Sequence, residues 1–337
     1  MKNIVYIGNK WNKNRNANFT SIDLLEPLFT DCGYTVFSAS DKKNIFLRMI
    51  NMLWLCFKQR NKTDYVLIDT YGTLNFYYAY LVSQFCRILK LKYLPILHGG
   101  KLPDRLKNFP VMSRAIFKNA HLNIAPSLFT KSNFEASGYT NIICIPNTVK
   151  LENYTFKERT FNDIKLLWVR SFSKMYNPLL AIKIIKLLND KNIKAELCMV
   201  GPDSDGSLLD VKNYADELGV VVTFTGKLSK QEWIKRSNHY NIFINTTNVD
   251  NMPVSVIESM ALGLPVISTN VGGIPFLIED DKTGILVEPN SVEAFVMAII
   301  RLMNSPDDTR KMVKNAREYA EQFDWKTIKN QWVEVLR

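Results

Sequence analysis

The sequence has few of the residues from which metal centres and disulfide frameworks are built, and it has no long apolar run. Its three histidines are distant from one another, which excludes a structural zinc site. Its five cysteines form no Cys-x-x-Cys pair, and this scatter favours reduced thiols in the cytoplasm. The longest apolar segment, residues 45–57, is interrupted by Arg48 and Asn51, which argues against a membrane span. The first residues show no signal-peptide cleavage site, so we expect a cytoplasmic protein.

Acidic residues are scarce in the first half of the chain. Residues 1–150 contain 20 Lys and Arg against 8 Asp and Glu, a charge of +12, whereas residues 151–337 carry −1. The excess indicates either an acidic partner, such as membrane headgroups or a phosphorylated lipid, or a charge that only keeps the chain soluble. Nucleic acid is not an expected partner, because aromatic and basic residues do not interleave in a recognition motif.

Chain length and the alternation of strand and helix patterns predict two domains. A chain of 337 residues suits two cores, and its 47% of apolar residues suffice to fill them. Short β-rich runs alternate with helix-length segments, which indicates an α/β fold with parallel sheets. Strands are expected at 3–7, 34–39, 65–69, 93–97, 122–125 and 142–146, then at 164–169, 195–200, 220–225, 242–245, 265–268 and 285–287. Helices are expected between them, including 20–29, 76–89 and 105–118, with capping boxes at Ser229–Glu232 and Asn290–Glu293.

The polar segment 147–163 breaks this rhythm and is expected to link the domains. We therefore place a Rossmann-like domain at 1–149 and a second at 150–323. The carboxyl-terminal helix at 324–337 is expected to pack back toward the first domain. Ligands of such sheets bind beyond the carboxyl ends of the strands, so we expect a site in the cleft between the two domains.

The segment after the strand at 164–169 carries two cations. Arg170 and Lys174 precede a helix that begins near Asn177 and Pro178, and the free amides of its first turn also favour anions. Arginine makes paired hydrogen bonds and lysine adds a second charge, so this pattern suits a diphosphate. Two ordinary exposed loop cations are the alternative.

Two carboxylates flank the start of a later helix. Asp250 lies in the loop after the strand at 242–245, and Glu258 lies a turn and a half into a helix whose first residue is expected to be Pro253. A carboxylate in a cleft accepts hydrogen bonds from sugar hydroxyls. The apolar neighbours of Glu258 predict that it is buried and has a partner. Alternatively, Asp250 only caps the helix and Glu258 faces solvent.

Three further loops at strand ends contain glycine, histidine or paired acids. The paired glycines 272–273 allow a backbone to approach a ligand closely, but such pairs also occur in ordinary turns. His98 ends a strand and precedes Gly99, a position that suits catalysis as well as a structural role. Asp203 and Asp205 form the Asp-x-Asp pair that binds metal–nucleotide complexes in some transferases. Their turn-rich surroundings favour local hydrogen bonding instead.

Taken in order, these loops resemble the group 1, or family four, retaining glycosyltransferases of the GT-B fold. The most specific stretch, DNMPVSVIESMALGLPVIST at 250–269, is similar to the E-x7-E signature of that family. LLWVRSFSKMYNP at 166–178 resembles its Arg…Lys diphosphate clamp, and IPNTV at 145–149 resembles its hinge. ILHGG at 96–100 and IAPS at 124–127 resemble strand ends of its acceptor domain. The resemblance covers nearly the whole chain and implies two Rossmann-like domains facing across a cleft.

The resemblance implies a role for each loop. Arg170 and Lys174 would hold the donor diphosphate, and Glu258 would bind the ribose. Asp250 would face the donor sugar, and His98 would contact that sugar near its reacting carbon. Further donor contacts would come from Gly226, Lys227, Leu228, Asn251, Met252, Pro253 and Val254, with loop amides at Gly272 and Gly273.

The sequence departs from the family pattern at three places. Asp250 replaces the usual Glu and reaches one methylene less far. The two clamp cations are four residues apart, whereas five is common in the family. The glycine-rich amino-terminal loop is reduced to Gly8, which weakens its expected approach to the donor phosphates. The remaining residues assigned to an acceptor or phosphate loop are Lys10, Lys13, Arg15 and Gly99.

The resemblance implies a retaining transferase that moves a sugar from a nucleoside-diphosphate donor to a hydroxyl of a saccharide or lipid-linked acceptor. A UDP-sugar is favoured over a GDP-sugar, and the expected setting is surface polysaccharide assembly at the inner membrane face of a bacterium. Arg170, Lys174 and helix amides would stabilise the leaving phosphate, so neither a metal nor a cofactor is expected. Since no second carboxylate is expected near His98, a front-face displacement is favoured.

Three other functions fit parts of the pattern. A nucleotide-sugar epimerase of the same fold would need no acceptor. A non-catalytic nucleotide-sugar binder is suggested by Asp250 and would bind the donor without hydrolysing it. A dinucleotide-dependent oxidoreductase is disfavoured, because Gly8-Asn9-Lys10 stands where the G-x-G-x-x-G fingerprint would follow the first strand.

Overall fold

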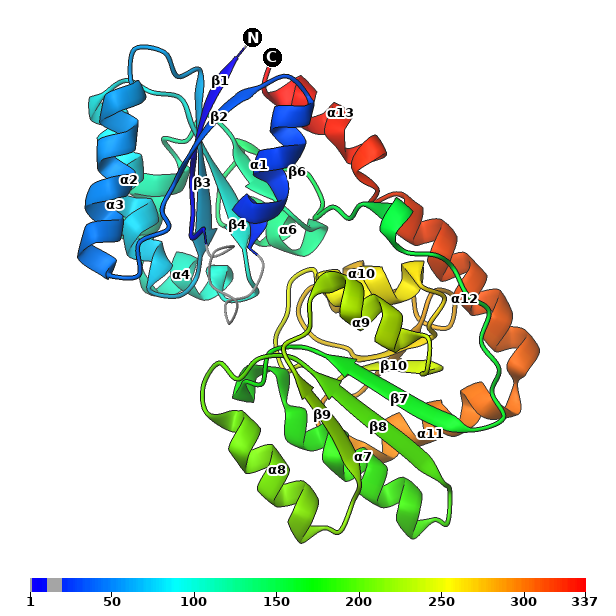
Figure 1. Cartoon of the computed structure of the whole chain (residues 1–337). Coiled ribbons are helices and arrows are strands. Elements are labelled where there is room, and N and C mark those ends of the chain that lie inside the picture. Colours follow the sequence, from blue (N-terminus) through cyan, green and yellow to red (C-terminus); the bar gives the residue numbers. More distant parts are fainter. Residues whose placement is uncertain (1, 11–19) are drawn as a thin grey trace. The chain divides into compact units, whose positions relative to one another are not determined.

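The chain folds into two compact units (Figure 1). The computed structural model describes residues 2–10 and 20–337. The first unit comprises Met1–Pro146 together with Glu334–Arg337, and the second comprises Asn147–Val333. Among the described residues, no helix has the length and apolar character needed to cross a bilayer.

The first unit is built on a six-stranded parallel sheet with the strand order β2-β1-β3-β4-β5-β6. Its strands are β1 (Asn3–Ile7), β2 (Thr35–Ala39), β3 (Tyr65–Tyr71), β4 (Tyr93–His98), β5 (Asn123–Ala125) and β6 (Ile142–Cys144). All six lie where the sequence predicts strands. The chain leaves β1 toward β2 and leaves β3 toward β4. The topological switch point of this sheet therefore lies between β1 and β3, where doubly wound sheets bind ligands.

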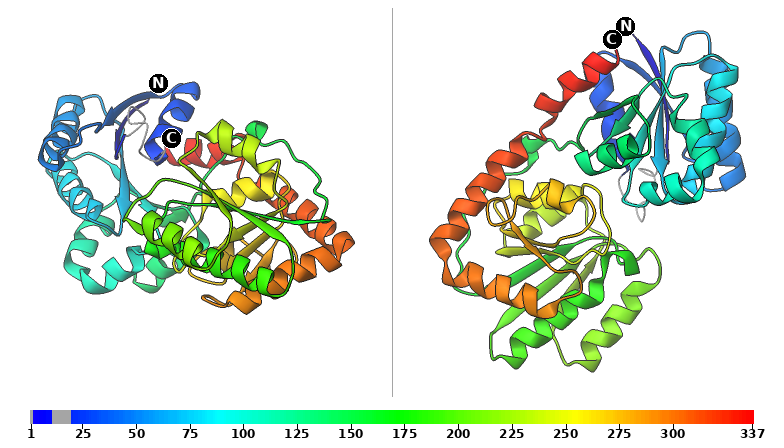
Figure 2. Two further views of the ribbon diagram at one scale, coloured as in Figure 1. Left: turned by 60° about the horizontal axis from the view of Figure 1, so that its bottom comes forward. Right: turned by 180° about the vertical axis from the view of Figure 1, so that it is seen from behind.

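Helices cover both faces of this sheet, with α2 and α3 on one face and α1 and α6 on the other (Figures 1 and 2). The helices are α1 (Ser21–Asp31), α2 (Ile45–Gln59), α3 (Asn75–Ile88), α4 (Leu102–Asn108), α5 (Pro110–Phe117) and α6 (Leu128–Ala136). The prediction of a single helix at 105–118 is wrong. Pro110 has no amide hydrogen with which to continue α4, so it begins α5 instead.

The second unit repeats the plan around a parallel sheet with the strand order β12-β11-β10-β7-β8-β9. Its strands are β7 (Ile164–Val169), β8 (Ala195–Val200), β9 (Val222–Gly226), β10 (Ile242–Asn245), β11 (Val266–Thr269) and β12 (Ile285–Val287). Read from β9, this is the Rossmann order 3-2-1-4-5-6, with its switch point between β7 and β10. The predicted α/β class with two parallel sheets is confirmed.

Two apolar cores lie on the two faces of the second sheet. One core is formed with α7, α8 and α11, and the other with α9 and α10. The helices of this unit are α7 (Pro178–Asp190), α8 (Ser207–Glu217), α9 (Lys230–Ser237), α10 (Val254–Ala261), α11 (Val292–Asn304), α12 (Pro306–Glu321) and α13 (Trp325–Val335). Short 3-10 helices occur at η1 (Leu151–Asn153), η2 (Lys174–Tyr176) and η3 (Ile274–Phe276).

One of the two predicted capping boxes is present. The hydroxyl of Ser229 accepts from the amide of Glu232 at 3.3 Å, and the Glu232 carboxylate accepts from the Ser229 amide at 2.7 Å. The box predicted at Asn290 is wrong, because Ser291 caps α11 and accepts from Ala294 N at 3.1 Å. Asn290 lies one residue earlier, with a φ of 63°.

The segment after α12 returns to the start of the second unit. Val149 N donates to Phe323 O, and Trp325 N donates to Val149 O, both at 3.0 Å. The hydroxyl of Thr148 also donates to Phe323 O, at 2.9 Å. The segment predicted to link the domains is thus tied into the second unit at its start. The expected packing of the final helix against the first domain stays a prediction.

Candidate active site

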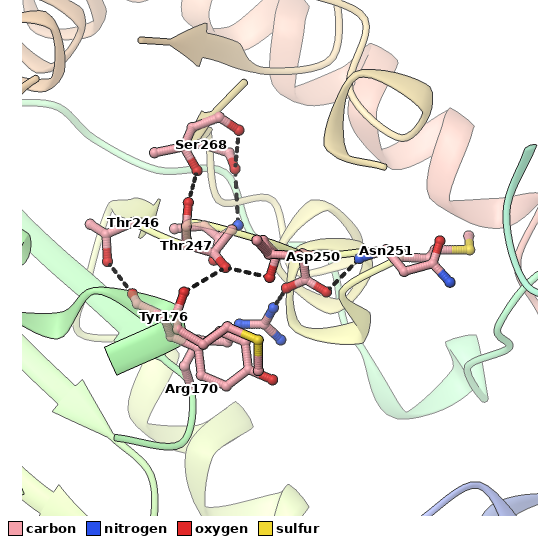
Figure 3. Close-up of polar contacts among 12 residues, drawn as sticks. Arg170, Tyr176, Thr246, Thr247, Asp250, Asn251 and Ser268 are labelled. Carbon is pink, nitrogen blue, oxygen red and sulfur yellow. Dashed lines mark hydrogen bonds and ion pairs between the residues drawn. The ribbon is translucent and has the colours of Figure 1, made fainter. Parts of the chain in front are cut away.

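The carboxyl ends of β7 and β10 bring two of the predicted residues together. Arg170 directly follows β7, and Asp250 lies in the loop after β10. Their side chains form an ion pair (Figure 3), and only 13% and 14% of their surfaces are exposed. A cation and a carboxylate therefore meet at the switch point of the sheet.

Both members of this pair are held by the surrounding loops. Arg170 N donates to Val200 O at 3.0 Å, and its guanidinium lies 4.3 Å from the ring centre of Tyr176. Burial lowers the pKa of Arg170 from its ordinary value, yet a guanidinium stays protonated in proteins. The amide of Asn251 donates to Oδ1 of Asp250 at 2.9 Å. The charges are thus oriented before any ligand binds.

Three glycines let the loops that carry this pair approach one another closely. A Cβ at Gly201 would lie 1.7 Å from Arg170 O, and one at Gly273 would lie 1.9 Å from Asn251 O. At Gly272 it would lie 2.3 Å from the carbonyl oxygen of Asp250. The paired glycines therefore bring one loop against the backbone of another, which sequence reasoning could not distinguish from an approach to a ligand.

Replacing Gly273 with alanine is expected to lower the free energy of unfolding of the second unit by about 3 kcal/mol, since the new methyl group overlaps backbone atoms. The φ of Gly273 is −87°, so backbone strain adds nothing to this cost. Gly219→Ala is the matched control: it has a φ of +64° but open space around its Cβ, and should cost about 1 kcal/mol. Urea unfolding followed by tryptophan fluorescence checks both variants. Equal losses would contradict the steric explanation.

Lys174 begins η2, four residues after Arg170. Its backbone amide and the hydroxyl of Ser173 each donate to Asp205 Oδ2 at 2.9 Å. Burial disfavours the charged form of Asp205, but hydrogen bonds from Ser207, Lys174 and Ser173 outweigh this and lower its pKa to about 2. The Lys174 side chain is exposed and forms no ion pair within the described part of the chain. Asp205 thus holds the Lys174 loop from a distant part of the sequence. The local hydrogen bonding predicted for the Asp-x-Asp pair is present as well, since Gly206 N donates to Asp203 Oδ1 at 2.9 Å and Ser207 N to Asp205 Oδ1 at 3.2 Å.

Two residues that sequence reasoning missed connect η2 to the end of β10. The hydroxyl of Thr246 donates to Tyr176 O at 2.9 Å (Figure 3), and the amide of Asn248 donates to Met175 O at 2.9 Å. These bonds hold the backbone of η2, which carries Tyr176, against the end of β10. Their signal in the sequence is the polar run at 245–248, which directly ends a buried strand.

Glu258 is 3% exposed in α10, as its apolar neighbours predict. Its Oε1 accepts a hydrogen bond from the hydroxyl of Tyr154 at 2.6 Å and also forms an ion pair with Lys230, the first residue of α9. Burial, and then the charge of Glu258, raises the pKa of Tyr154, so this hydroxyl stays a donor. Oε2 forms no hydrogen bond with a described residue, which leaves it free to accept one from a ligand.

The start of α10 differs by one residue from the prediction. Val254 is the first helical residue and Pro253 is the N-cap, with a φ of −69° and a ψ of 116°, so the placement of Pro253 inside the helix is wrong. Asn251 and Met252 are buried just before it, and Met252 O accepts from the side-chain amide of Asn147 at 3.0 Å.

Gly226, Lys227 and Leu228 connect β9 to α9. Gly226 has a φ of +67°, and its carbonyl accepts from Gly201 N at 2.9 Å. This segment therefore joins the Arg170 loop, through Gly201, to the helix whose first residue pairs with Glu258. The predicted donor-binding segments of the second unit thus all lie at the carboxyl end of its sheet.

The first unit gathers polar residues at its own switch point. Gly8 follows β1, Asp69 lies in β3 and His98 ends β4. The Nε2 atom of His98 is 2.8 Å from Asp69 Oδ1, which also accepts from the hydroxyl of Tyr6 at 3.0 Å. The ring of Tyr71 stacks on the imidazole, with centroids 4.9 Å apart. His98 is 7% exposed and is fixed both by a carboxylate and by an aromatic ring.

Asp69 is a residue that sequence reasoning missed, and it corrects an expectation. The premise that no second carboxylate lies near His98 is wrong. Asp69 Oδ2 is buried and has no hydrogen-bond partner among the described residues. A Cβ at Gly8 would lie 2.5 Å from this oxygen, so the glycine makes room for the carboxylate. The signal in the sequence is a single acid at the end of an apolar strand.

The predicted acceptor loop is only partly described. Lys10 forms an ion pair with Glu26 at 2.6 Å and donates to Ser38 Oγ at 3.0 Å, so its charge is countered within the first unit. Lys13 and Arg15 lie outside the described residues. Gly99 follows His98 with a φ of +80°, which turns the chain sharply away after the imidazole.

A family model described as glycosyl transferases group 1 matches residues 152–319, which include both the Arg170–Asp250 pair and Glu258. The chain belongs to the group 1 glycosyltransferases. A curated relative, the sulfoquinovosyl transferase SQD2 of Arabidopsis thaliana, is 29% identical over 154 residues, covering 43% of this chain and 28% of that protein. The chain thus spans less than a third of that relative's length.

Solved structures resemble this group 1 glycosyltransferase over its whole length. Sucrose-phosphate synthase from Thermosynechococcus elongatus has a TM-score of 0.84 at 18% identity, covering 99% of this chain and 98% of that one. Anabaena HepE in complex with UDP-glucose has a TM-score of 0.80 at 16% identity, covering 100% of this chain and 99% of that one. This likeness concerns the fold, and it confirms the predicted GT-B fold.

The structure of this group 1 glycosyltransferase sorts the predicted residues into three local groups. Arg170 and Asp250 contact each other directly, and Glu258 instead contacts two residues that were not predicted. His98 belongs to the first unit, where its neighbour is Asp69. The chemistry available is thus an oriented guanidinium, a partly exposed and a buried carboxylate, and an imidazole with a carboxylate partner.

Proposed function

We propose that this chain transfers a sugar from a nucleoside-diphosphate donor to a hydroxyl of an acceptor, with retention of configuration. The observation that carries the proposal is the ion pair of Arg170 and Asp250 at the switch point of the unit that matches the family model. Departure of the nucleoside diphosphate builds negative charge on its phosphate, and an oriented guanidinium stabilises that charge. Asp250 stands beside it as an acceptor for hydroxyls of the sugar.

Glu258 supports the same proposal from the nucleoside side of the donor. A buried carboxylate whose one oxygen is held by Tyr154 and Lys230 presents its other oxygen in a fixed direction. Vicinal hydroxyls, such as those of a ribose, are suitable donors for it. The backbone of Gly226, Lys227 and Leu228 follows the neighbouring strand and is our candidate for contact with the base.

We propose a UDP-sugar as the donor and no metal in the reaction. HepE, whose fold is similar, was crystallised with UDP and with UDP-glucose, which supports uridine for this chain. Lys174 lies four residues beyond Arg170, and its exposed ammonium can add a second positive charge near the diphosphate. Together the two cations supply the charge that a divalent ion supplies elsewhere.

The acceptor that we propose is a saccharide or a sugar on a lipid diphosphate, in the assembly of a bacterial surface polysaccharide at the inner membrane face. The charge of +12 on residues 1–150 supports an anionic acceptor or surface for this half of the chain. His98 and Asp69 are our candidates for contact with the reacting sugar or the acceptor hydroxyl.

A thermal-shift series with UDP, GDP, ADP, CDP and NAD, with and without EDTA, tests the donor proposal. UDP at 100 times its dissociation constant should stabilise the wild type by about 2.7 kcal/mol, whether or not EDTA is present. Glu258→Gln should weaken UDP binding by about 10- to 100-fold, since it removes a hydrogen bond to a charged group. Glu232→Gln, on the exposed first turn of α9, is the matched control and should bind UDP like the wild type.

Two results of this series would overturn the assignment. Stabilisation by NAD alone would point to a dinucleotide site instead. An equal response of Glu258→Gln and the wild type would remove Glu258 from the donor site. Stabilisation by UDP that disappears with EDTA would contradict the metal-free reaction while leaving the donor class in place.

A further inference from the structure

Helix α2 presents an apolar face that the described part of the chain leaves uncovered. Six of its large apolar side chains are between 40% and 80% exposed. We call them the α2 face: Ile45, Phe46, Leu47, Ile50, Trp54 and Phe57. Exposed apolar residues occur singly on most proteins, but a contiguous group of this size marks an interaction surface.

The spacing of these residues, apart from Ile45 at the start of the helix, places them along one side of α2. Phe46, Ile50, Trp54 and Phe57 follow one another at intervals of four, four and three, which is one stripe of an α-helix. The opposite side is occupied, because Met52 and Cys56 are fully buried against the sheet of the first unit. A helix that already buries one apolar side in its own core should be polar on the other, and α2 is not.

The charged residues around the α2 face are almost all basic. Helix α2 contains no acidic residue, and neither does α3, which lies beside it (Figures 1 and 2). Exposed cations stand at both ends of the helix: Lys43 before it, and Lys58, Arg60 and Lys62 at its end and after it. The nearest acids are engaged, since Asp41 pairs with Lys42 at 3.4 Å and Asp64 accepts from Asn3 N at 2.7 Å.

Aromatic residues of the α2 face suit the boundary between lipid and water. Trp54 and Phe57 pack together with ring centres 5.9 Å apart. The guanidinium of Arg60 lies 4.0 Å from the ring centre of Phe57, so a cation and an apolar ring are in contact at the end of the helix. Tryptophan and such snorkelling cations are enriched where a protein meets the headgroups of a bilayer.

We propose that the first unit docks on an anionic membrane by laying α2 in the headgroup region, with the α2 face toward the acyl chains and the flanking cations on the lipid phosphates. The geometry disfavours a second copy of this chain as the occupant. In a two-fold pairing of α2 faces, Lys43, Lys58, Arg60 and Lys62 would meet their own like charges. The surface requires no nucleotide or sugar, so this proposal stands independently of sugar transfer.

Flotation of the full chain with lipid vesicles tests the proposal without any substrate. The wild type should float with vesicles of phosphatidylcholine containing about 30% phosphatidylglycerol, and far less with phosphatidylcholine alone. Phe46→Gln with Ile50→Gln should reduce the bound fraction by about tenfold or more, because both side chains leave the apolar face. Leu209→Gln with Met297→Gln is the matched control, since these residues are 64% and 67% exposed on helices of the second unit. Circular dichroism melting confirms that all variants fold.

Two further arms separate insertion from simple attraction of charge. Lys58→Gln with Lys62→Gln, or about 0.5 M NaCl, should weaken binding several-fold without abolishing it. Brominated lipids should quench the fluorescence of the wild type, and Trp54→Phe should lose this quenching while still floating. Absence of flotation, or equal flotation of the wild type and Phe46→Gln with Ile50→Gln, would overturn the proposal. A dimer that this double variant dissociates would assign the α2 face to a second copy instead.

Discussion

Replacing Arg170 with methionine is expected to reduce the release of nucleoside diphosphate from the donor by about 100- to 1,000-fold. The variant keeps much of the side-chain volume but removes the charge that, on our proposal, stabilises the leaving phosphate. Arg170→Lys should recover only part of the activity, because an ammonium cannot make the paired hydrogen bonds of a guanidinium. Initial rates with a UDP-sugar, and the dissociation constant of UDP by calorimetry, measure both effects.

The same substitution leaves the carboxylate of Asp250, which is only 14% exposed, without its ion-pair partner. Removing one partner of such a pair should also destabilise the second unit, by up to about 3 kcal/mol. Asp250→Asn combined with Arg170→Met removes the stranded charge, so the double variant should regain stability but not activity. Arg301→Met is the control, because Arg301 pairs with Asp281 on the exposed surface at 2.7 Å. Recovery of activity in the double variant would show that the pair serves the fold alone.

Replacing Asp69 with asparagine is expected to lower turnover by about 100-fold while the affinity for UDP stays unchanged. The amide removes the charge that orients the His98 ring but keeps the shape of the side chain. His98→Ala should lose at least as much, and the two changes together should cost little more than His98→Ala alone. Separate measurement of kcat and of the dissociation constant of UDP checks this, since the loss should appear in kcat alone.

Tyr6→Phe is the matched control for Asp69→Asn. It removes the 3.0 Å hydrogen bond to Asp69 Oδ1 but leaves the carboxylate and its 2.8 Å contact with His98. We expect a loss of turnover below tenfold and an unchanged affinity for UDP. An effect as large as that of Asp69→Asn would assign the network to packing instead. A covalent sugar adduct found on Asp69 or Asp250 by mass spectrometry would exclude the front-face displacement.

Much of the fold follows from local features of the sequence. A strand buried on both faces of a parallel sheet is a short apolar run, and the polar residue that follows it marks the carboxyl end. This rule applies to Arg170, which follows β7, and to the polar loop after β10, which leads to Asp250. The candidate donor residues could therefore be found without a structure. The burial of Glu258 could be predicted for a similar reason, from its apolar neighbours on α10.

The partners of these residues could not be predicted, because they depend on which strands are neighbours. His98 and Asp69 are 29 residues apart and meet because β3 pairs with β4. Tyr154 and Glu258 are 104 residues apart, and nothing in either segment indicates the other. The role of Gly8 could not be predicted either. From the sequence alone, a glycine that makes room for a carboxylate cannot be distinguished from one that makes room for a phosphate.

The ion pair of Arg170 and Asp250 also affects how well the protein can distinguish its ligand from other anions in a cell. Because Asp250 already pairs with its guanidinium, Arg170 does not bind other anions without competition. A small anion such as inorganic phosphate must compete with an internal carboxylate and has no further contacts with which to compensate. On our proposal, a nucleotide-sugar would bring a ribose for Glu258 and hydroxyls that donate hydrogen bonds to Asp250. It would therefore replace the ion pair with new bonds to both partners. The internal salt bridge would thus act as a filter against abundant simple anions.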